Sequence, residues 1–159
     1  MEMMRPIAHY IASSVMTAGS KFSNDSYPHR ELTRQIIGAC FRVHNARGYG
    51  FLEVAYRRAL AVELRLAGLS VEQEVPYELT HLGCSIGTYF ADLVVESLVL
   101  VEVKTGLVLD PVAVPQTLNY LRASRLPLGL VAYFGPRVSL KRVILTWQGH
   151  SVRDEPVAE

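Results

Sequence analysis

The chain has few of the features that mark secreted or membrane proteins. It contains two cysteines, Cys40 and Cys84, which form neither a disulfide framework nor a metal-ligand spacing. Its first apolar stretch, residues 7–18, is short and carries one histidine, two serines and a threonine. Such a stretch is a poor signal peptide and too short to span a membrane. We therefore expect a reduced, cytoplasmic protein without a membrane partner.

An excess of charge of one sign is also missing. Sixteen Lys and Arg face 15 Asp and Glu, which gives a formal charge of +1, so net charge does not indicate a nucleic-acid partner. Residues 30–65, however, hold seven Arg against three Glu. Such a basic face can contact phosphates, and an ordinary solvated helix face explains it equally well. The arginines considered for nucleic-acid contact are Arg30, Arg34, Arg42, Arg57 and Arg58.

The size and composition of the chain suit one domain with a substantial core. It has 159 residues, of which 50% are hydrophobic and 19% charged. Residues 1–28 lack clean periodicity and are expected to form a flexible N-terminal segment. We expect residues 29–148 to form the folded domain and residues 149–159 to form a polar C-terminal tail.

Hydrophobic periodicity predicts the elements of that domain. A first helix begins near Arg30 and breaks at residues 48–50, and a second runs from residue 51 to about residue 67. The next pattern predicts strands at residues 71–79, 88–95 and 98–105, with a turn region at 81–87, a helix at 112–124, and strands at 128–134 and 140–147. The order α-α-β-β-β-α-β-β predicts an α/β fold, in which helices flank a central mixed sheet.

Three charged residues interrupt the two most apolar strands. Asp92 lies in one strand, whereas Glu102 and Lys104 are two residues apart in the next and therefore share a face. A turn at residues 96–97 would place Asp92 opposite residue 101 or 102. Two carboxylates held close together favour a hard cation such as Mg²⁺ or Mn²⁺ between them. A buried carboxylate–lysine ion pair is the alternative interpretation.

These residues resemble the D-x(n)-E-x-K signature of the PD-(D/E)xK nuclease superfamily. Two more motifs strengthen the likeness, because residues 50–56 read G-x-x-E-x-x-Y and residues 116–120 read Q-x-x-x-Y. Together they resemble the bacterial GxxExxY family, a small branch of that superfamily, over about residues 31–144. The resemblance implies a restriction-endonuclease-like core and metal-dependent hydrolysis of phosphodiester bonds in nucleic acid, with DNA the expected substrate.

The resemblance also implies which residues form the metal site. Asp92 and Glu102 would bind Mg²⁺ or Mn²⁺, and Glu53 would assist as a ligand or through water. Glu53 also has a purely structural explanation, because the helix dipole favours an acidic residue in the first turn.

Catalytic roles follow from the same comparison. Lys104 and Gln116 would position the attacking water and the phosphate, with Glu53 beside them. Tyr120 lies one helical turn after Gln116 and could contact nucleic acid, although a core aromatic explains it equally well.

Two other functions are compatible with the sequence. The chain could keep the nuclease fold as a non-catalytic module that binds nucleic acid or another protein. It could also hydrolyse a phosphodiester other than nucleic acid. The intact set of Asp92, Glu102 and Lys104 favours catalysis, because a simple binding module does not need paired buried carboxylates. A homodimer or a separate partner protein also agrees with the sequence.

Overall fold

The computed structural model describes residues 28–146 and 149–154, so the predicted flexible segment lies outside the described residues except for residue 28. Helices α1 (Arg30–Arg47) and α2 (Glu53–Leu66) open the fold. The other elements are β1 (Val71–His81), β2 (Cys84–Val95), β3 (Val99–Thr105), α3 (Ala113–Ser124), β4 (Leu128–Phe134), β5 (Val138–Thr146) and β6 (Gly149–Asp154).

The strands form one mixed sheet in the order β1-β2-β3-β4-β5-β6. β3 and β4 run parallel, and the other neighbouring strands are antiparallel. Parallel neighbours need a long crossover, and α3 supplies it. The predicted α/β architecture, a mixed sheet flanked by helices, is therefore confirmed.

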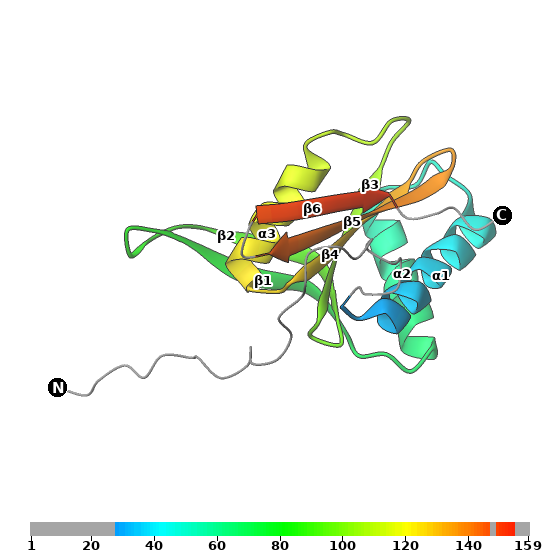
Figure 1. Cartoon of the computed structure of the whole chain (residues 1–159). Coiled ribbons are helices and arrows are strands. Elements are labelled where there is room, and N and C mark those ends of the chain that lie inside the picture. The colour runs from blue at the N-terminus through cyan, green and yellow to red at the C-terminus, as the bar shows by residue number, and fades with distance from the viewer. Residues whose placement is uncertain (1–27, 147–148, 155–159) are drawn as a thin grey trace, which may run out of the picture.

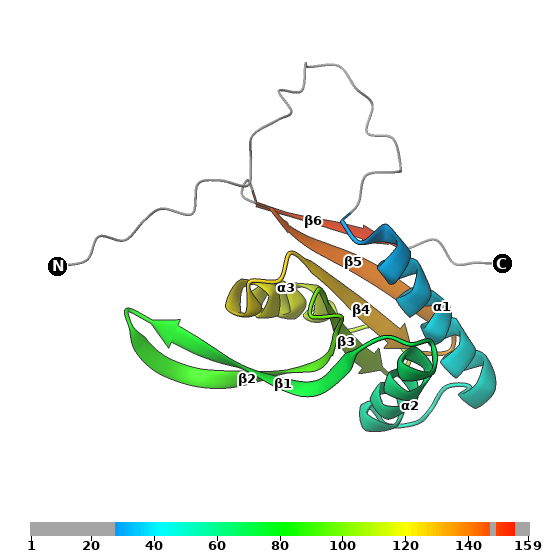
Figure 2. The same cartoon turned by 90° about the horizontal axis from the view of Figure 1, so that it is seen from below.

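The helices cover both faces of the sheet. α1 and α2 pack on the face that receives Val101 and Val103 of β3. α3 packs on the opposite face, against Leu100 of β3 and Val131 of β4 (Figures 1 and 2). The first five residues of β3 are buried, as expected for a central strand covered on both sides.

The turn between β2 and β3 lies where the sequence predicts it. Glu96 and Ser97 have φ angles of 53° and 55°, and the N–H of Leu98 donates to the carbonyl of Val95 at 3.0 Å. Two successive left-handed residues match the twist of an antiparallel hairpin, although neither residue type is the favoured one. This turn sets the register of the two strands that carry the acidic residues.

Two expectations about the strands were wrong. The turn region predicted at residues 81–87 is shorter, since only Leu82 and Gly83 separate β1 from β2. The predicted polar tail does not start at Gly149, because residues 149–154 form β6 and pair antiparallel with β5. Backbone hydrogen bonds can extend a sheet at its edge without an apolar side-chain pattern, so no periodic signal marks this strand in the sequence.

β1 and β2 extend beyond the rest of the sheet as a curved two-stranded arm (Figure 2). β2 pairs with β3 only from Leu93 to Val95. Glu74, with a φ of 52°, interrupts β1 at the position opposite Asp92. The side chains of β2 change from one face of the sheet to the other at this point. Leu93 belongs to the core under α1 and α2, whereas Ala91, two residues earlier, belongs to the core under α3. The arm therefore curves around α3.

No helix among residues 28–146 is both long enough and apolar enough to cross a membrane.

Candidate active site

Asp92 lies where β2 separates from β3. Its Oδ2 accepts a 2.8 Å hydrogen bond from the backbone N–H of Val103, which lies beyond the last β2–β3 pair. Because Leu93 pairs with Val101, Asp92 falls opposite Glu102, which is one of the two positions that the predicted turn allows. The hydrogen bond holds the carboxylate of Asp92 against β3.

Glu102 and Lys104 lie side by side on the α3 face of β3. Lys104 Nζ is 3.2 Å from Glu102 Oε1, and the Glu102 side chain is 5% exposed. The second oxygen, Oε2, is buried and has no hydrogen-bond partner. Burial, followed by the negative charge of Asp92, raises the pKa of Glu102 from 4.5 to about 7, although Lys104 opposes the shift. The positive charge of Lys104 thus compensates the ionised form of Glu102 only in part.

The start of α2 brings two more charged residues to this cluster. Glu53 is exposed, and its negative charge also raises the pKa of Glu102. Arg57, one turn later, places Nη1 3.3 Å from Asp92 Oδ1 and Nη2 3.0 Å from Glu74 Oε1. Its side chain is only 14% exposed. The sequence made Arg57 a candidate for nucleic-acid contact, and the structure turns its guanidinium toward two carboxylates.

α3 contributes Gln116 and Tyr120. Gln116 Nε2 donates a 2.9 Å hydrogen bond to Tyr120 Oη. Burial, followed by the negative charge of Glu102, raises the pKa of Tyr120 to about 12, so its hydroxyl stays protonated at neutral pH. The Tyr120 ring meets the ring of Tyr89 edge-on, with 4.2 Å between the centroids. Tyr120 is therefore a buried core aromatic whose hydroxyl lies within electrostatic reach of Glu102.

The remaining arginines of the predicted basic face lie elsewhere. Arg30, Arg34 and Arg42 belong to α1, which packs mainly on α2 and β5. Arg42 Nε forms a 2.8 Å ion pair with Glu63 Oε2 on α2. Arg58 is exposed on α2. Asp92, Lys104 and Glu53 thus act on the charge of Glu102, which acts on Tyr120, and Gln116 connects to this group through its hydrogen bond to Tyr120. In contrast, α1 lies on the opposite face of the sheet from α3.

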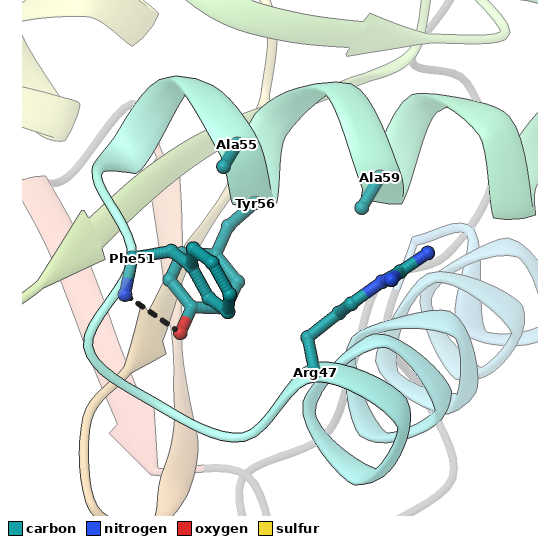
Figure 3. Close-up of a pocket in the computed structure, with 5 residues that line it drawn as sticks. All are labelled: Arg47, Phe51, Ala55, Tyr56 and Ala59. Carbon is teal, nitrogen blue, oxygen red and sulfur yellow. Dashed lines mark hydrogen bonds between the residues drawn. The ribbon is translucent and has the colours of Figure 1, made fainter.

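The tyrosine of the G-x-x-E-x-x-Y motif supports the fold rather than the carboxylates. Tyr56 Oη donates to the carbonyl of Gly48 at 2.7 Å. It also accepts from the N–H of Phe51 at 3.4 Å (Figure 3). Its ring stacks on Phe134 with 4.6 Å between centroids. Tyr56 therefore anchors the α1–α2 loop, which sets the position where α2 and Glu53 begin. A pocket of about 260 Å³ beside this loop is lined by Arg47, Phe51, Ala55, Tyr56 and Ala59.

Asp92 and Glu102 are the two carboxylates that could share a metal ion. In the described part of the chain, no three His, Cys, Asp or Glu side chains are grouped so that they could hold a metal, so the predicted role of Glu53 as a ligand or through water stays a prediction. Mg²⁺ commonly takes only one or two protein carboxylates and completes its shell with water and substrate phosphate. The unpartnered Oε2 of Glu102 and its raised pKa fit a cation placed beside Asp92.

A family model covers most of the chain. Residues 30–143 match the model of the PD-(D/E)XK nuclease superfamily. The chain belongs to that superfamily. The match does not separate the GxxExxY branch from other branches. A solved structure titled "Crystal structure of SSO0001" is similar, with a TM-score of 0.38 and 17% identity over 77% of this chain and 67% of its own. No curated protein matches the chain.

Two contacts of this PD-(D/E)XK domain were not expected from the sequence. Arg57 follows Glu53 by four residues, so the two share a helix face, and that spacing could have indicated a role beside the acidic cluster. Tyr89 meets Tyr120 only because the β1–β2 arm curves around α3. No local pattern in the sequence marks that contact.

Proposed function

We propose that this protein is a metal-dependent nuclease that hydrolyses phosphodiester bonds in nucleic acid, with DNA the expected substrate. The observation that carries the proposal is that the carboxylate of Glu102 is buried and only partly paired. Its buried carboxylate lies beside Asp92, has Lys104 on one oxygen, and leaves the other oxygen without a partner. A structural ion pair would satisfy both oxygens of a buried carboxylate, whereas this arrangement favours a further positive group.

Each residue would have a distinct task in the reaction. Asp92 and Glu102 would hold Mg²⁺ or Mn²⁺, with Glu53 acting through water. The bound ion would supply Lewis-acid polarisation of the phosphate and lower the pKa of water. Val103 N–H and Arg57 would hold Asp92 in place through their hydrogen bonds to its two oxygens.

Lys104 and Gln116 would act on the reacting groups. The ammonium of Lys104 would hold the attacking water and stabilise negative charge that develops on the phosphate. The amide of Gln116, which Tyr120 orients by a hydrogen bond, would position water or a phosphate oxygen. Water oxygen would bond to phosphorus as the bond from phosphorus to the leaving oxygen breaks, without a covalent enzyme intermediate.

Cleavage by wild type and Lys104→Ala tests the proposal. We expect wild type to cleave DNA in the presence of Mg²⁺ or Mn²⁺ and to stop when EDTA removes the ion. Lys104→Ala should keep its fold and substrate affinity but lose at least about 100-fold in kcat, because Lys104 acts mainly in the transition state. The matched control is Lys141→Ala on β5, which β4 separates from β3.

The outcome also separates the enzyme from its alternatives. Tight binding of single- or double-stranded DNA or RNA without cleavage by either ion would establish a binding module instead. A protein that neither binds nor cleaves these polymers would show that nucleic acid is the wrong substrate class. Equal kcat values for wild type and Lys104→Ala would remove the lysine from the mechanism.

A further inference from the structure

A second hollow lies between the β1–β2 arm and α3. Its volume is about 480 Å³, and the arm curves around α3 at this place (Figure 2). The residues that line this α3–arm hollow come from both elements and from the residue after α3: Glu78, Leu79, Thr80, Tyr89, Asn119, Arg122, Ala123 and Arg125.

The hollow lies next to the candidate active site, with the packed rings of Tyr89 and Tyr120 between them. Tyr89 lines it, and the same ring contacts Tyr120, whose hydroxyl accepts from Gln116. On α3, Gln116, Tyr120 and Ala123 recur every three to four residues and therefore share one face of the helix. A ligand that passes from Gln116 over the Tyr89–Tyr120 pair and on along α3 would reach the hollow.

The far end of the hollow is basic. Arg122 and Arg125 line it, and both are exposed. Arg122 Nη1 donates to the neutral amide oxygen of Asn119 at 2.9 Å. Neither arginine forms an ion pair with a residue that the structure describes. Glu78 is the acidic residue of the lining, so the two guanidinium groups outnumber the carboxylate and can take phosphate oxygens.

We propose that the α3–arm hollow binds the phosphate backbone of the nucleic-acid strand to one side of the bond that is cut. The inference rests on the proposed nuclease function and names the surface that holds its substrate. At 1.5 Å per helical residue, Arg122 and Arg125 lie roughly 9 and 14 Å along α3 from Gln116. At 3.4 Å per nucleotide along a strand of B-DNA, this is about three to four nucleotides from the active site.

This surface differs from the basic face that the sequence indicated. Arg30 and Arg34 lie on α1, on the opposite side of the sheet from α3. A strand held by α1 would leave the hollow empty, whereas a strand that follows α3 passes Gln116 before it reaches Arg122. The two surfaces therefore predict different arginine variants to weaken binding.

A binding experiment distinguishes the α3–arm hollow from the α1 surface. It measures how the affinity for a labelled single-stranded DNA oligonucleotide of about 20 nucleotides depends on salt, in the presence of EDTA. Arg122→Ala/Arg125→Ala should bind about tenfold more weakly at 50 mM salt. Its slope of log affinity against log salt should fall by about 1.4, because two phosphate contacts are lost. The matched control, Arg30→Ala/Arg34→Ala, should keep the affinity and slope of wild type.

Two further variants keep the test independent of folding defects. Arg122→Lys/Arg125→Lys should retain most of the slope, because the positive charges remain. Glu78→Gln should bind more tightly than wild type, because it removes a carboxylate from the hollow. An unchanged slope in Arg122→Ala/Arg125→Ala would overturn the inference, and so would a loss of affinity confined to the Arg30→Ala/Arg34→Ala control.

The same variants separate this inference from the nuclease proposal. Binding in EDTA needs no catalysis, so the hollow can be confirmed in a protein that does not cleave. Conversely, hydrolysis of bis(p-nitrophenyl) phosphate, which is too small to reach the hollow, tests the active site alone. We expect Arg122→Ala/Arg125→Ala to hydrolyse this small diester at the wild-type rate while oligonucleotide cleavage falls. A parallel loss for both substrates would overturn a role in strand binding.

Discussion

The guanidinium of Arg57 lies 3.3 Å from the carboxylate of Asp92 and connects it to Glu74, which is 3.0 Å from the other terminal nitrogen. The two carboxylates at the centre of the site therefore have different partners. Asp92 has an arginine and a backbone N–H, whereas Glu102 has a lysine on one oxygen and no partner on the other. Because of this difference, we expect the two carboxylates to respond differently to mutation, metal and pH.

Removing the guanidinium of Arg57 should make the stability of the domain depend more on a bound cation. We expect Arg57→Ala to destabilise the metal-free protein by about 1–3 kcal/mol, because a largely buried charged hydrogen-bond donor is lost. Mn²⁺ should then raise the melting temperature of Arg57→Ala by more than it raises that of wild type. Thermal unfolding with and without Mn²⁺ measures both effects, and Arg58→Ala on the same helix is the control. Equal Mn²⁺ responses in Arg57→Ala and wild type would contradict this role.

Replacing Asp92 should abolish the rise in melting temperature that a bound metal ion causes. An ion that binds only the folded state stabilises it by mass action, by about 2.7 kcal/mol at a concentration 100 times its dissociation constant. We expect Mn²⁺ to raise the melting temperature of wild type but not of Asp92→Asn. Glu72→Gln removes an exposed carboxylate of β1 and should respond like wild type. A response that survives in Asp92→Asn would show that the ion binds elsewhere.

The raised pKa of Glu102 predicts how stability depends on pH. The folded protein holds this proton up to a pKa of about 7, whereas the unfolded chain releases it near 4.5. Burial of the carboxyl group therefore does not lower the free energy of unfolding below pH 4.5. The full loss of stability is present once the pH has risen above 7. Glu102→Gln carries no titrating proton, so it should gain stability relative to wild type between these values, on the order of 3 kcal/mol in total.

Unfolding by urea in EDTA at several pH values between 4 and 8 tests this dependence. The difference between Glu102→Gln and wild type should grow steadily across the range. Glu72→Gln, an exposed change of the same kind, should show a small and constant difference. A constant difference for Glu102→Gln would mean that the carboxyl group titrates normally in the folded protein.

Tyr56 should matter for stability and not for the chemical step. Its hydroxyl donates to the Gly48 carbonyl at 2.7 Å, so Tyr56→Phe should cost about 1 kcal/mol and lower the melting temperature by roughly 2–8 °C. At temperatures where both proteins are folded, kcat should match that of wild type. Tyr120→Phe provides the comparison, because it removes the hydroxyl that accepts from Gln116 and should lower kcat. A large fall in kcat for Tyr56→Phe alone would contradict the structural assignment.

The sequence by itself determined the element order as far as β5, the two-faced packing of β3 and the position of Asp92 opposite Glu102. Each of these depends on local spacing: helical or alternating periodicity, and the length of the turn at residues 96–97. A residue two positions along a strand returns to the same face whatever the rest of the protein does. For that reason, the spacing of Glu102 and Lys104 alone was enough to pair them.

Tertiary structure decided which charged side chains lie together and how far the pKa of Glu102 shifts. Arg57 and Arg34 are both helical arginines in sequence, yet one contacts Asp92 and the other is exposed on α1. The shift in the pKa of Glu102 comes first from burial, which depends on how α3 and the strands close around it. The α3–arm hollow exists because the arm bends at Glu74, a residue in the left-handed conformation. At this bend the side chains of the arm change from one face of the sheet to the other. Such long-range packing leaves no periodic signal in the chain, so only the folded structure could bring Tyr89 to Tyr120 and place Arg122 in a hollow beside them.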